Sequence, residues 1–505
     1  MVRTVPAPSQ RVVVIGAGLA GLSAALHLRG SGREVTVLER ADHAGGRVGR
    51  YTGADYVIDN GATVLTMPEL ITEALAAIGA STDLRIRRLD PSYHARFADG
   101  STINVHSDAD AMFAEVSRTC GPAEAQRYLQ LRRWLAAVFT AEYDTFMAAN
   151  FDSPLNLVSS RRSFTDLMTL VRLGAFGRLG PKVGRFIGDE RLRRLFTFQA
   201  LYAGLAPQQA LAVYGAIPHM DTSLGVFFPD GGMASIAEAM ADALTTAGGR
   251  VELGAEVTRI HFEGRRATAV HTRDCREFPC DAVVLTADLG SLPGLIGDKA
   301  PRRKLHAAPS AVVLHGTVPT AVSQQWPTGA HHVIEFGKAW ADTFAEITAR
   351  NGCGRLMSDP SLLLTRPALT DPALVIRRGT ETYEPFSVLA PCPNLRSAPL
   401  DWDRLAPAYA EDLLVQLERR GYTAIAESFQ VDWIDTPATW RRQGMLAGSP
   451  FSASHLFRQT GPFRTANLLR RTENVVLAGC GTTPGVGVPT VLISGKLAAA
   501  RIMGG

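Results

Sequence analysis

Three glycines and one acidic residue near the N-terminus have the spacing of a nucleotide-binding turn. Gly16, Gly18 and Gly21 directly follow an apolar run at 12–15, and Glu39 ends the next apolar run about 20 positions later. In such a turn the first glycine lets the chain reverse, the second lets backbone N–H groups approach a pyrophosphate, and the third lets helix and strand pack closely. The acid accepts hydrogen bonds from a ribose. We therefore expect a dinucleotide site at Gly16, Gly18, Leu19, Ala20, Gly21 and Glu39.

The residues after Glu39 bear on which dinucleotide is bound. NAD-dependent domains of this kind usually continue into another helix, whereas here a second glycine pair and an arginine precede a segment that ends near residue 63. This pattern resembles the FAD-binding arm of amine-oxidase-like flavoproteins. A surface loop that turns at the glycine pair is the alternative, and the intact glycine motif next to it favours the FAD arm. The residues concerned are Arg40, Gly45, Gly46, Arg47, Gly61, Ala62 and Thr63.

A second glycine-rich segment lies near the C-terminus. It spans 479–487, between an apolar strand predicted at 474–478 and a helix predicted at 491–500. Glycine and proline at this density let the backbone approach a flat, partly anionic ligand, with the positive end of a helix close by. The alternative is an ordinary long turn.

Length and composition limit the class of protein. A chain of 505 residues is too long for one core, so two or three domains are expected. The net charge of +4 is too small to indicate nucleic-acid binding. The six cysteines lack metal-ligand spacing and are expected to be reduced thiols, so no metal site is predicted. Residues 1–10 lack the apolar region of a signal peptide, and no apolar run of about 18 residues occurs. We expect a cytoplasmic protein, soluble or peripherally membrane-bound.

The order of predicted elements indicates an α/β protein whose chain returns repeatedly to one nucleotide-binding domain. Strand–helix alternation gives way to a hairpin around residues 99–100, then to mostly helical sequence with a long helix predicted at 123–149. Residues 251–260 and 281–286 carry strand patterns. We expect a Rossmann-like FAD-binding domain at 10–66, 221–300 and 466–505, interleaved with an α+β substrate domain at 67–121 and 301–465 and a helical, membrane-associating region at 122–220.

One helical stretch is unusually basic. Between Arg161 and Arg194 lie nine Lys or Arg side chains against three Asp or Glu, interleaved with aromatic and aliphatic residues. A basic helix with an apolar face can lie in a membrane interface. The alternative is a helix packed on the core with a solvated basic face.

Motifs along nearly the whole chain resemble those of the bacterial-type phytoene desaturases, the flavin-dependent carotenoid desaturases. The resemblance rests on the N-terminal motif through residue 47 and on segments at 59–68, 202–207, 228–233, 331–336 and 479–489. Two positions depart from the family. Ala62 stands where proline is more common, and Thr490 stands where glycine is usual at the helix start. Neither departure removes a chemical group.

The resemblance implies non-covalently bound FAD and assigns residues to it. Gly16, Gly18 and Gly21 would hold the pyrophosphate, Glu39 the AMP ribose, and Arg47 would neutralise phosphate charge. The flavin would lie along 61–63, and the backbone of Val257 would meet the adenine. Gly479, Gly481 and Val488 would lie near the isoalloxazine and ribityl chain.

The resemblance also implies a reaction and a substrate. A C–C single bond of a long polyene, phytoene or a later carotene, is dehydrogenated towards neurosporene or lycopene, with oxygen or a quinone as the electron acceptor. The substrate has no polar group, so an apolar tunnel is expected. No catalytic base can be named, because His331 and His332 can equally be structural residues. A substrate drawn from a bilayer favours membrane binding through Arg161 to Arg194, at the inner face of the cell membrane.

Four other functions are possible on this scaffold. A carotene isomerase or a hydroxycarotenoid desaturase would use the same FAD parts. An amine oxidase would need an aromatic cage near the flavin, and the segment at 479–487 contains no tyrosine pair. Prenyl-lipid carriers such as the GDP-dissociation inhibitors bind lipid without catalysis, but the intact FAD motifs favour an enzyme.

Overall fold

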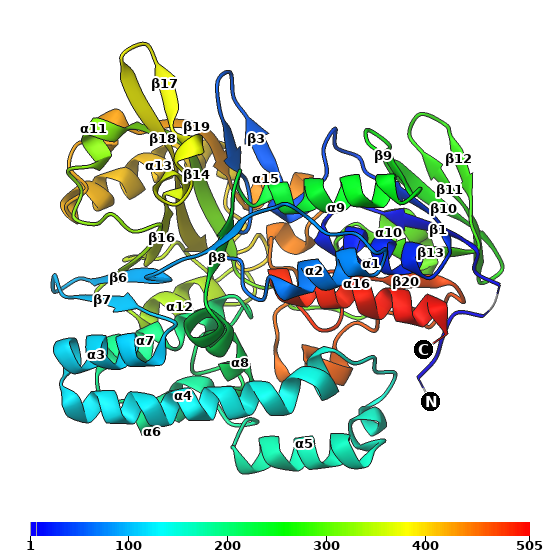
Figure 1. Cartoon of the computed structure of the whole chain (residues 1–505), viewed down its shortest axis with the longest axis horizontal. Helices are drawn as coiled ribbons and strands as arrows, with labels where there is room; N and C mark the ends of the chain where they lie inside the picture. Colours follow the sequence, from blue (N-terminus) through cyan, green and yellow to red (C-terminus); the bar gives the residue numbers. More distant parts are fainter. Residues whose placement is uncertain (1, 7, 505) are drawn as a thin grey trace.

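The computed structural model describes residues 2–6 and 8–504, and a five-stranded parallel sheet forms its nucleotide-binding half (Figure 1). The strand order is β20-β13-β1-β2-β9, drawn from three separate parts of the chain. The strands are β1 (Arg11–Ile15), β2 (Glu34–Leu38), β9 (Arg250–Glu252), β13 (Ala282–Leu285) and β20 (Val475–Leu477). Every pair in this sheet is parallel, which confirms the expected α/β class.

Successive side chains of β1 pack into two different hydrophobic cores, one on each face of the sheet. Val12 and Val14 face helices, whereas Val13 and Ile15 face a second, three-stranded sheet. On the helical side, α1 (Leu19–Gly30) packs against α2 (Glu69–Ala76), α9 (Ala234–Thr246) and α16 (Val488–Met503). The other side is covered by β10 (Val257–Glu263), β11 (Arg266–Thr272), β12 (Glu277–Pro279) and α10 (Leu292–Ile296). A strand buried on both faces explains the continuous apolar run at 12–15.

The strand pattern at 251–260 belongs to two strands in different sheets rather than to one. β9 pairs with β2 in the parallel sheet, and β10 begins at Val257 in the three-stranded sheet. Between them Gly254 has a positive φ of 66°, and its N–H donates to the Ala41 carbonyl at 2.8 Å. The backbone therefore turns from one sheet to the other within four residues.

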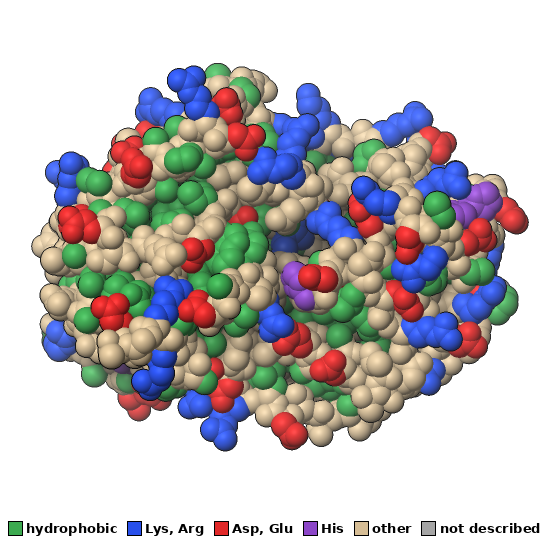
Figure 2. Space-filling model, turned by 90° about the horizontal axis from the view of Figure 1, so that it is seen from above, with side chains coloured by type: hydrophobic (Ala, Val, Ile, Leu, Met, Phe, Trp, Pro, Cys, Tyr) green, Lys and Arg blue, Asp and Glu red, His purple; other side chains and the backbone are tan. Residues whose placement is uncertain are grey.

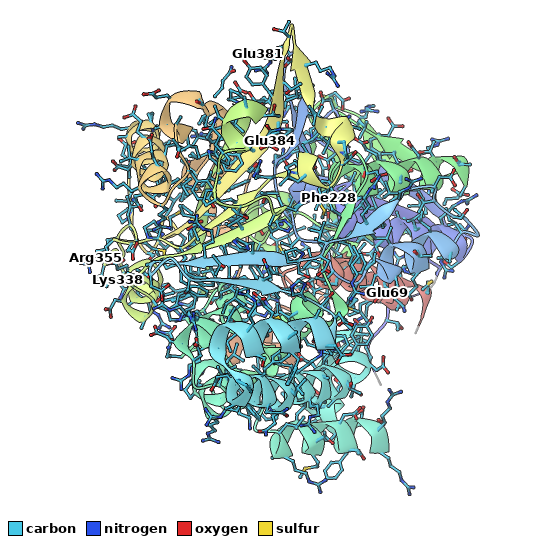
Figure 3. The ribbon with its side chains drawn as sticks, turned by 60° about the vertical axis from the view of Figure 1, so that its left-hand side comes forward. Glu69, Phe228, Lys338, Arg355, Glu381 and Glu384 are labelled. Carbon is cyan, nitrogen blue, oxygen red and sulfur yellow. The ribbon has the colours of Figure 1, made fainter. Side chains whose placement is uncertain are left out.

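A larger, mostly antiparallel sheet forms the other half. Its order is β19-β14-β18-β16-β15-β6-β7, with β17 paired to β18 and one parallel pair between β15 and β6. The strands are β6 (Tyr93–Phe97), β7 (Thr102–Val105), β14 (Ser310–Pro319), β15 (His332–Phe336), β16 (Leu362–Thr365), β17 (Ile376–Arg378), β18 (Glu381–Cys392) and β19 (Gln430–Asp435). Helix α13 (Trp402–Arg419) buries Trp402, Leu413 and Leu417 in the core of this half. In Figure 3, Glu381 marks the projecting tip between β17 and β18.

Helices between residues 109 and 195 form a layer below both sheets (Figure 1). They are α3 (Ala109–Cys120), α4 (Pro122–Glu142), α5 (Arg161–Arg172), α6 (Leu179–Phe186) and α7 (Glu190–Leu195). The helix predicted at 123–149 instead ends at Glu142 and continues as a π-helical turn, Tyr143–Met147. The basic stretch is three short helices rather than one, and Arg194 turns inward to donate to the Gly337 carbonyl at 2.7 Å.

The remaining elements connect these layers. Strands β3 (Arg50–Thr52) and β4 (Val57–Asp59) pair with each other, as do β5 (Ile86–Arg88) and β8 (Phe227–Pro229). The short helices are α8 (Ala216–His219), α11 (Thr320–Ser323), α12 (Ala341–Thr348), α14 (Ile425–Ser428) and α15 (Pro437–Arg442). Within residues 2–6 and 8–504 no helix is both long and apolar enough to cross a bilayer.

Candidate functional site

A large cavity of about 980 Å³ runs from the parallel sheet to the helical layer. Figure 2 shows the surface hollowed near its centre, with Lys and Arg side chains around the hollow. The cavity wall brings together residues expected at the site from five parts of the chain. They are Gly16, Gly18, Leu19, Ala20, Glu39, Arg40, Gly45, Gly46, Arg47, Gly61, Ala62, Thr63, Val257, Gly479 and Val488.

Two of the expected site residues lie outside this wall. Gly21 is buried in the first turn of α1, where an added Cβ would overlap the Gly16 carbonyl oxygen. It therefore lets α1 pack on the β1 turn, the role expected of the third glycine. Gly481 lines a small neighbouring pocket with Arg47, Asp288 and Cys480.

The turn after β1 is shaped to bring backbone N–H groups to the cavity. Gly16 has a φ of 105°, and an added Cβ there would overlap the Thr286 hydroxyl. Helix α1 begins after Gly18 with neither a side-chain cap nor an acid in its first turn. Its first N–H groups are thus left for a ligand, and the positive end of the helix favours an anion.

Glu39 is buried at the end of β2 and holds this turn together. One carboxylate oxygen accepts from the Ala17 N–H at 2.8 Å, and the other accepts from the Ala41 N–H at 2.9 Å. Each oxygen keeps a second lone pair, which a ribose hydroxyl can use.

We expect Glu39→Ala to weaken FAD binding at least about tenfold, because two backbone donors lose their acceptor and the turn loosens. The measurement is titration of the apoprotein with FAD, followed by quenching of flavin fluorescence. Glu34→Ala, at the exposed start of the same strand, is the matched control and should leave the affinity unchanged. Equal affinities for the two variants would contradict the assignment.

The C-terminal glycine segment forms the opposite side of the same site. The Gly479 N–H donates to the Ser494 hydroxyl at 3.0 Å, and that hydroxyl donates to the Thr483 carbonyl at 2.7 Å. Helix α16 begins after Gly487 without a side-chain cap or a first-turn acid. A second free helix N-terminus thus lies in the cavity region that contains Gly479 and Val488.

Arg47 does not extend freely into the cavity, because its guanidinium donates to Asp288 at 2.7 Å and to the Cys480 sulfur at 3.1 Å. Its positive charge is therefore shared with Asp288 rather than left wholly for a phosphate. Sequence reasoning missed Asp288. The available signal was its position just after the buried strand at 281–286, since ligands bind beyond the carboxyl ends of parallel strands.

Beyond the glycine turns the cavity continues between apolar walls. Strands of the large sheet contribute Ile334, Phe336, Leu363 and Leu389, and the helical layer contributes Leu167, Leu170 and Phe176. The lining includes one histidine among the described residues, His455, whose Nδ1 lies 2.8 Å from the Tyr214 hydroxyl. His331 and His332 do not line it. His331 pairs with Thr370 at 2.7 Å, and burial lowers the pKa of His332 to about 4.

These features fit a bound dinucleotide with a flat ring system. Two uncapped helix N-termini suit a pyrophosphate, a buried carboxylate suits a ribose, and an apolar chamber adjoins them.

Comparison with known proteins identifies the family. Residues 19–343 and 410–503 match the family described as flavin-containing amine oxidoreductases. The chain belongs to this family. It is an oxidoreductase and its cofactor is FAD, which confirms the cofactor expected from the sequence.

Relatives that match nearly the whole chain show which members of this family it is most usefully compared with. A phytoene dehydrogenase of Streptomyces griseus is 51% identical over 99% of this chain and 96% of its own length. A zeta-carotene-forming phytoene desaturase of Myxococcus xanthus is 32% identical over 98% of this chain and 94% of its own. These names confirm the resemblance to the bacterial-type phytoene desaturases.

Solved structures show the same fold at low identity. An oxidoreductase from Methanosarcina mazei aligns with a TM-score of 0.61 at 16% identity, covering 96% of this chain and 99% of that chain. Putrescine oxidase aligns with a TM-score of 0.59 at 15% identity, covering 99% and 100%. They support the amine-oxidase-like FAD-binding fold.

Proposed function

We propose that the protein is an FAD-dependent carotenoid desaturase that dehydrogenates phytoene, or a later carotene, towards neurosporene or lycopene. The observation that carries the proposal is the apolar chamber that adjoins the FAD-binding turns. A long hydrocarbon can be recognised only by length, shape and burial, so this chamber suits it. The relative that is 51% identical over nearly the whole chain is a phytoene dehydrogenase, which supports the same substrate class.

We also propose roles for the residues around FAD. The turn at Gly16, Gly18, Leu19 and Ala20 would hold the pyrophosphate, with Glu39 and Arg40 at the AMP ribose and Val257 at the adenine. Gly45, Gly46 and Arg47 would cover the phosphates, and Gly61 to Thr63, Gly479, Gly481 and Val488 would surround the flavin. When bound, FAD supplies a two-electron acceptor for a hydride. The protein positions the polyene and excludes water.

Expression in a bacterium engineered to accumulate phytoene tests the activity. Pigment extraction and chromatography should show a coloured carotene, zeta-carotene, neurosporene or lycopene, and the product counts the desaturation steps. Unchanged phytoene in cells that contain folded, yellow protein would contradict phytoene as the substrate. Hydroxylated carotenes and cis-carotenes would then be supplied in turn, to distinguish a later desaturase from an isomerase.

A membrane-binding surface is the second part of the proposal. Leu155, Val158, Phe164, Val171 and Phe176 are large apolar side chains exposed by 45% or more, and all belong to the segment at 155–176. On α5, Phe164 and Val171 face outward, while Leu167 and Leu170 on the same helix line the cavity. An apolar helix face with arginines beside it suits insertion into a bilayer interface. A carotene could then pass from the bilayer into the cavity beside α5, which lies at the lower edge of the molecule in Figure 1.

Liposome flotation tests this surface. We expect Phe164→Ser/Val171→Ser to reduce binding to vesicles with anionic lipid at least about tenfold, because two apolar side chains lose the gain from insertion. Arg161→Glu/Arg172→Glu should also weaken binding. The loss should be larger at low salt than at high salt, because salt screens the attraction between the arginines and anionic lipid. Val415→Ser, at a similarly exposed position on α13, is the control. Binding unchanged in all variants would contradict the proposal.

We propose an inner-membrane-face location and oxygen or a membrane quinone as the electron acceptor. We further propose the domain division at 10–66, 221–300 and 466–505 for FAD, 67–121 and 301–465 for the substrate, and 122–220 for the helical region. Sheet membership supports this division. The parallel sheet takes its strands from the first set of segments and the large sheet from the second.

A further inference from the structure

We propose that Asp221 is the group that accepts the proton lost from the substrate during desaturation. This assignment rests on the proposed function and names a residue that the sequence left unassigned. Asp221 lies on a π-helical turn, Met220–Leu224, and lines the cavity. Turns of this kind are rare and occur frequently at functional sites.

Elimination among the acidic side chains of the cavity leads to this residue. Of the described residues, five carboxyl groups line it: Glu39, Glu142, Asp221, Glu256 and Asp288. Three of these have strong partners. Glu39 accepts from two backbone N–H groups, Asp288 pairs with Arg47, and Glu256 pairs with Arg273 at 2.8 Å. Of these five carboxyl groups, Glu142 and Asp221 neither pair with a basic side chain nor accept hydrogen bonds from two backbone N–H groups.

Hydrogen bonding separates the last two. Glu142 Oε2 is buried with no hydrogen-bond partner among the described residues, so nothing at this oxygen stabilises the ionised form, and burial raises the pKa of Glu142 to about 8. Asp221 Oδ2 instead lies 3.3 Å from the Tyr93 hydroxyl, which orients the carboxylate and stabilises its ionised form. Burial raises the pKa of Asp221 to about 7, with hydrogen bonds from Tyr93 and Gln199 acting in the opposite direction. A carboxyl group that titrates near the working pH is well matched to proton transfer.

The histidine of the cavity is a poorer acceptor. An added Cβ on Gly485 would lie 2.8 Å from His455 Nε2, so the backbone of Gly485 covers this nitrogen. Its other ring nitrogen is occupied by the Tyr214 hydroxyl. Neither ring nitrogen of His455 is therefore open to a polyene.

A chain of contacts connects Asp221 with Thr63, one of the residues expected at the flavin. The Tyr93 hydroxyl lies 3.3 Å from Asp221 Oδ2, and Tyr202 lies beside both groups on the cavity wall. The Tyr93 ring packs on the His332 ring with centroids 5.7 Å apart, and His332 in turn lies against the Thr63 backbone. The titratable groups that face Asp221 are the two tyrosines, whose own pKa values burial raises further above neutral.

The chemistry requires one such group. Converting a C–C single bond to a double bond removes two hydrogens from adjacent carbons. One leaves with both electrons of its C–H bond, which the bound oxidised flavin can accept. The other leaves as a proton, its bonding pair becomes the new π bond, and a lone pair of the Asp221 carboxylate forms the O–H bond. The substrate loses two electrons, for which FAD would be the acceptor when bound. A terminal acceptor of two electrons and two protons would then return both the cofactor and the Asp221 carboxylate to their starting states.

The test uses the FAD-loaded enzyme and the carotene that it converts in the expression experiment. The rate of anaerobic flavin bleaching by this carotene should fall at least about 100-fold in Asp221→Asn, the usual scale of a lost general base. FAD content, thermal stability and carotene binding should stay unchanged. Asp221→Glu keeps the carboxyl group and should restore much of the rate.

The pH profile separates a proton acceptor from a structural residue. In the wild-type enzyme the bleaching rate should rise with pH through a midpoint near the pKa of about 7, because only the ionised carboxylate accepts a proton. Asp221→Asn should lose this rise. Tyr93→Phe should move the midpoint to higher pH, because the hydrogen bond from Tyr93 lowers the pKa of Asp221.

Each outcome decides a different point. An Asp221→Asn enzyme that bleaches within about threefold of wild type, or keeps the wild-type profile, overturns the assignment. If Asp221→Asn does not fold, the Tyr93→Phe profile decides, and an unmoved midpoint counts against Asp221. A wild-type flavin that no acyclic carotene bleaches overturns the proposed function itself.

Discussion

Gly21→Ala is expected to yield a protein that is recovered without FAD and unfolds at lower temperature. The added Cβ would overlap the Gly16 carbonyl oxygen and would lie 3.3 Å from a Val14 methyl group. Because the Gly16 carbonyl oxygen is a backbone atom, no side-chain rotation can relieve the overlap, and α1 must move away from β1. Overpacking of this kind costs about 1–3 kcal/mol. The shift also displaces the free N–H groups at the start of α1, so FAD should bind at least about tenfold more weakly.

The ratio of flavin to protein absorbance after purification, together with a thermal melt, measures both effects. Gly329→Ala is the matched control, because Gly329 is exposed and an added Cβ there meets nothing within 4 Å. The control should retain full FAD and an unchanged melting temperature. A Gly21→Ala protein that keeps its flavin would show that α1 and the turn can separate without loss of the site.

The nucleotide-binding turn could be predicted from sequence because its determinants are local. Gly16 to Gly21 and Glu39 belong to one strand–helix–strand unit, and two of them act within it: Gly21 packs on Gly16, and Glu39 accepts from the Ala17 N–H. The same holds for the hairpin of β6 and β7, which forms at the predicted place around 99–100. Short-range geometry leaves few alternatives in such units.

Residues that meet across the fold could not be found in this way. Asp221, Tyr93 and Tyr202 come from a π-helical turn, a sheet strand and a loop, more than 100 positions apart at the extremes. Each has an ordinary explanation when seen alone. Only the fold shows that Asp221 and Tyr202 line one cavity and that the Tyr93 hydroxyl lies 3.3 Å from Asp221 Oδ2. Asp288 differs, because its position after a buried strand was a local signal. Only its pairing with Arg47, 241 positions away, needed the fold.

The basic stretch shows how charge patterning can mislead about geometry. The count of arginines between 161 and 194 predicted one basic surface, but Arg191 and Arg194 lie beyond a helix break and pair with Asp189 and Glu190. What distinguishes the outer face is not charge but the row of exposed apolar side chains from Leu155 to Phe176. Exposure depends on tertiary packing, which residue counts do not contain.

Glu384→Met is expected to cost about 3–5 kcal/mol of unfolding free energy, the usual result of leaving one partner of a buried ion pair alone. Arg366 follows β16 and Glu384 lies in β18, and both side chains are only 3% exposed. Two guanidinium nitrogens of Arg366 donate to one Glu384 oxygen at 3.0 and 2.7 Å, and a third donates to the Thr328 carbonyl at 2.8 Å. Figure 3 shows Glu384 within the large sheet, whose strands line the cavity.

A double-mutant cycle in denaturant measures how much of this loss comes from the orphaned arginine. Arg366→Met/Glu384→Met should recover part of the stability lost in Glu384→Met, because it removes the buried charge that has no partner. Asp403→Asn, which breaks the exposed pair with Arg442, is the control and should cost at most about 1 kcal/mol. A double variant that is less stable than Glu384→Met would contradict this expectation. It would mean that the hydrogen bond from Arg366 to the Thr328 carbonyl stabilises the fold by more than the unpaired charge costs.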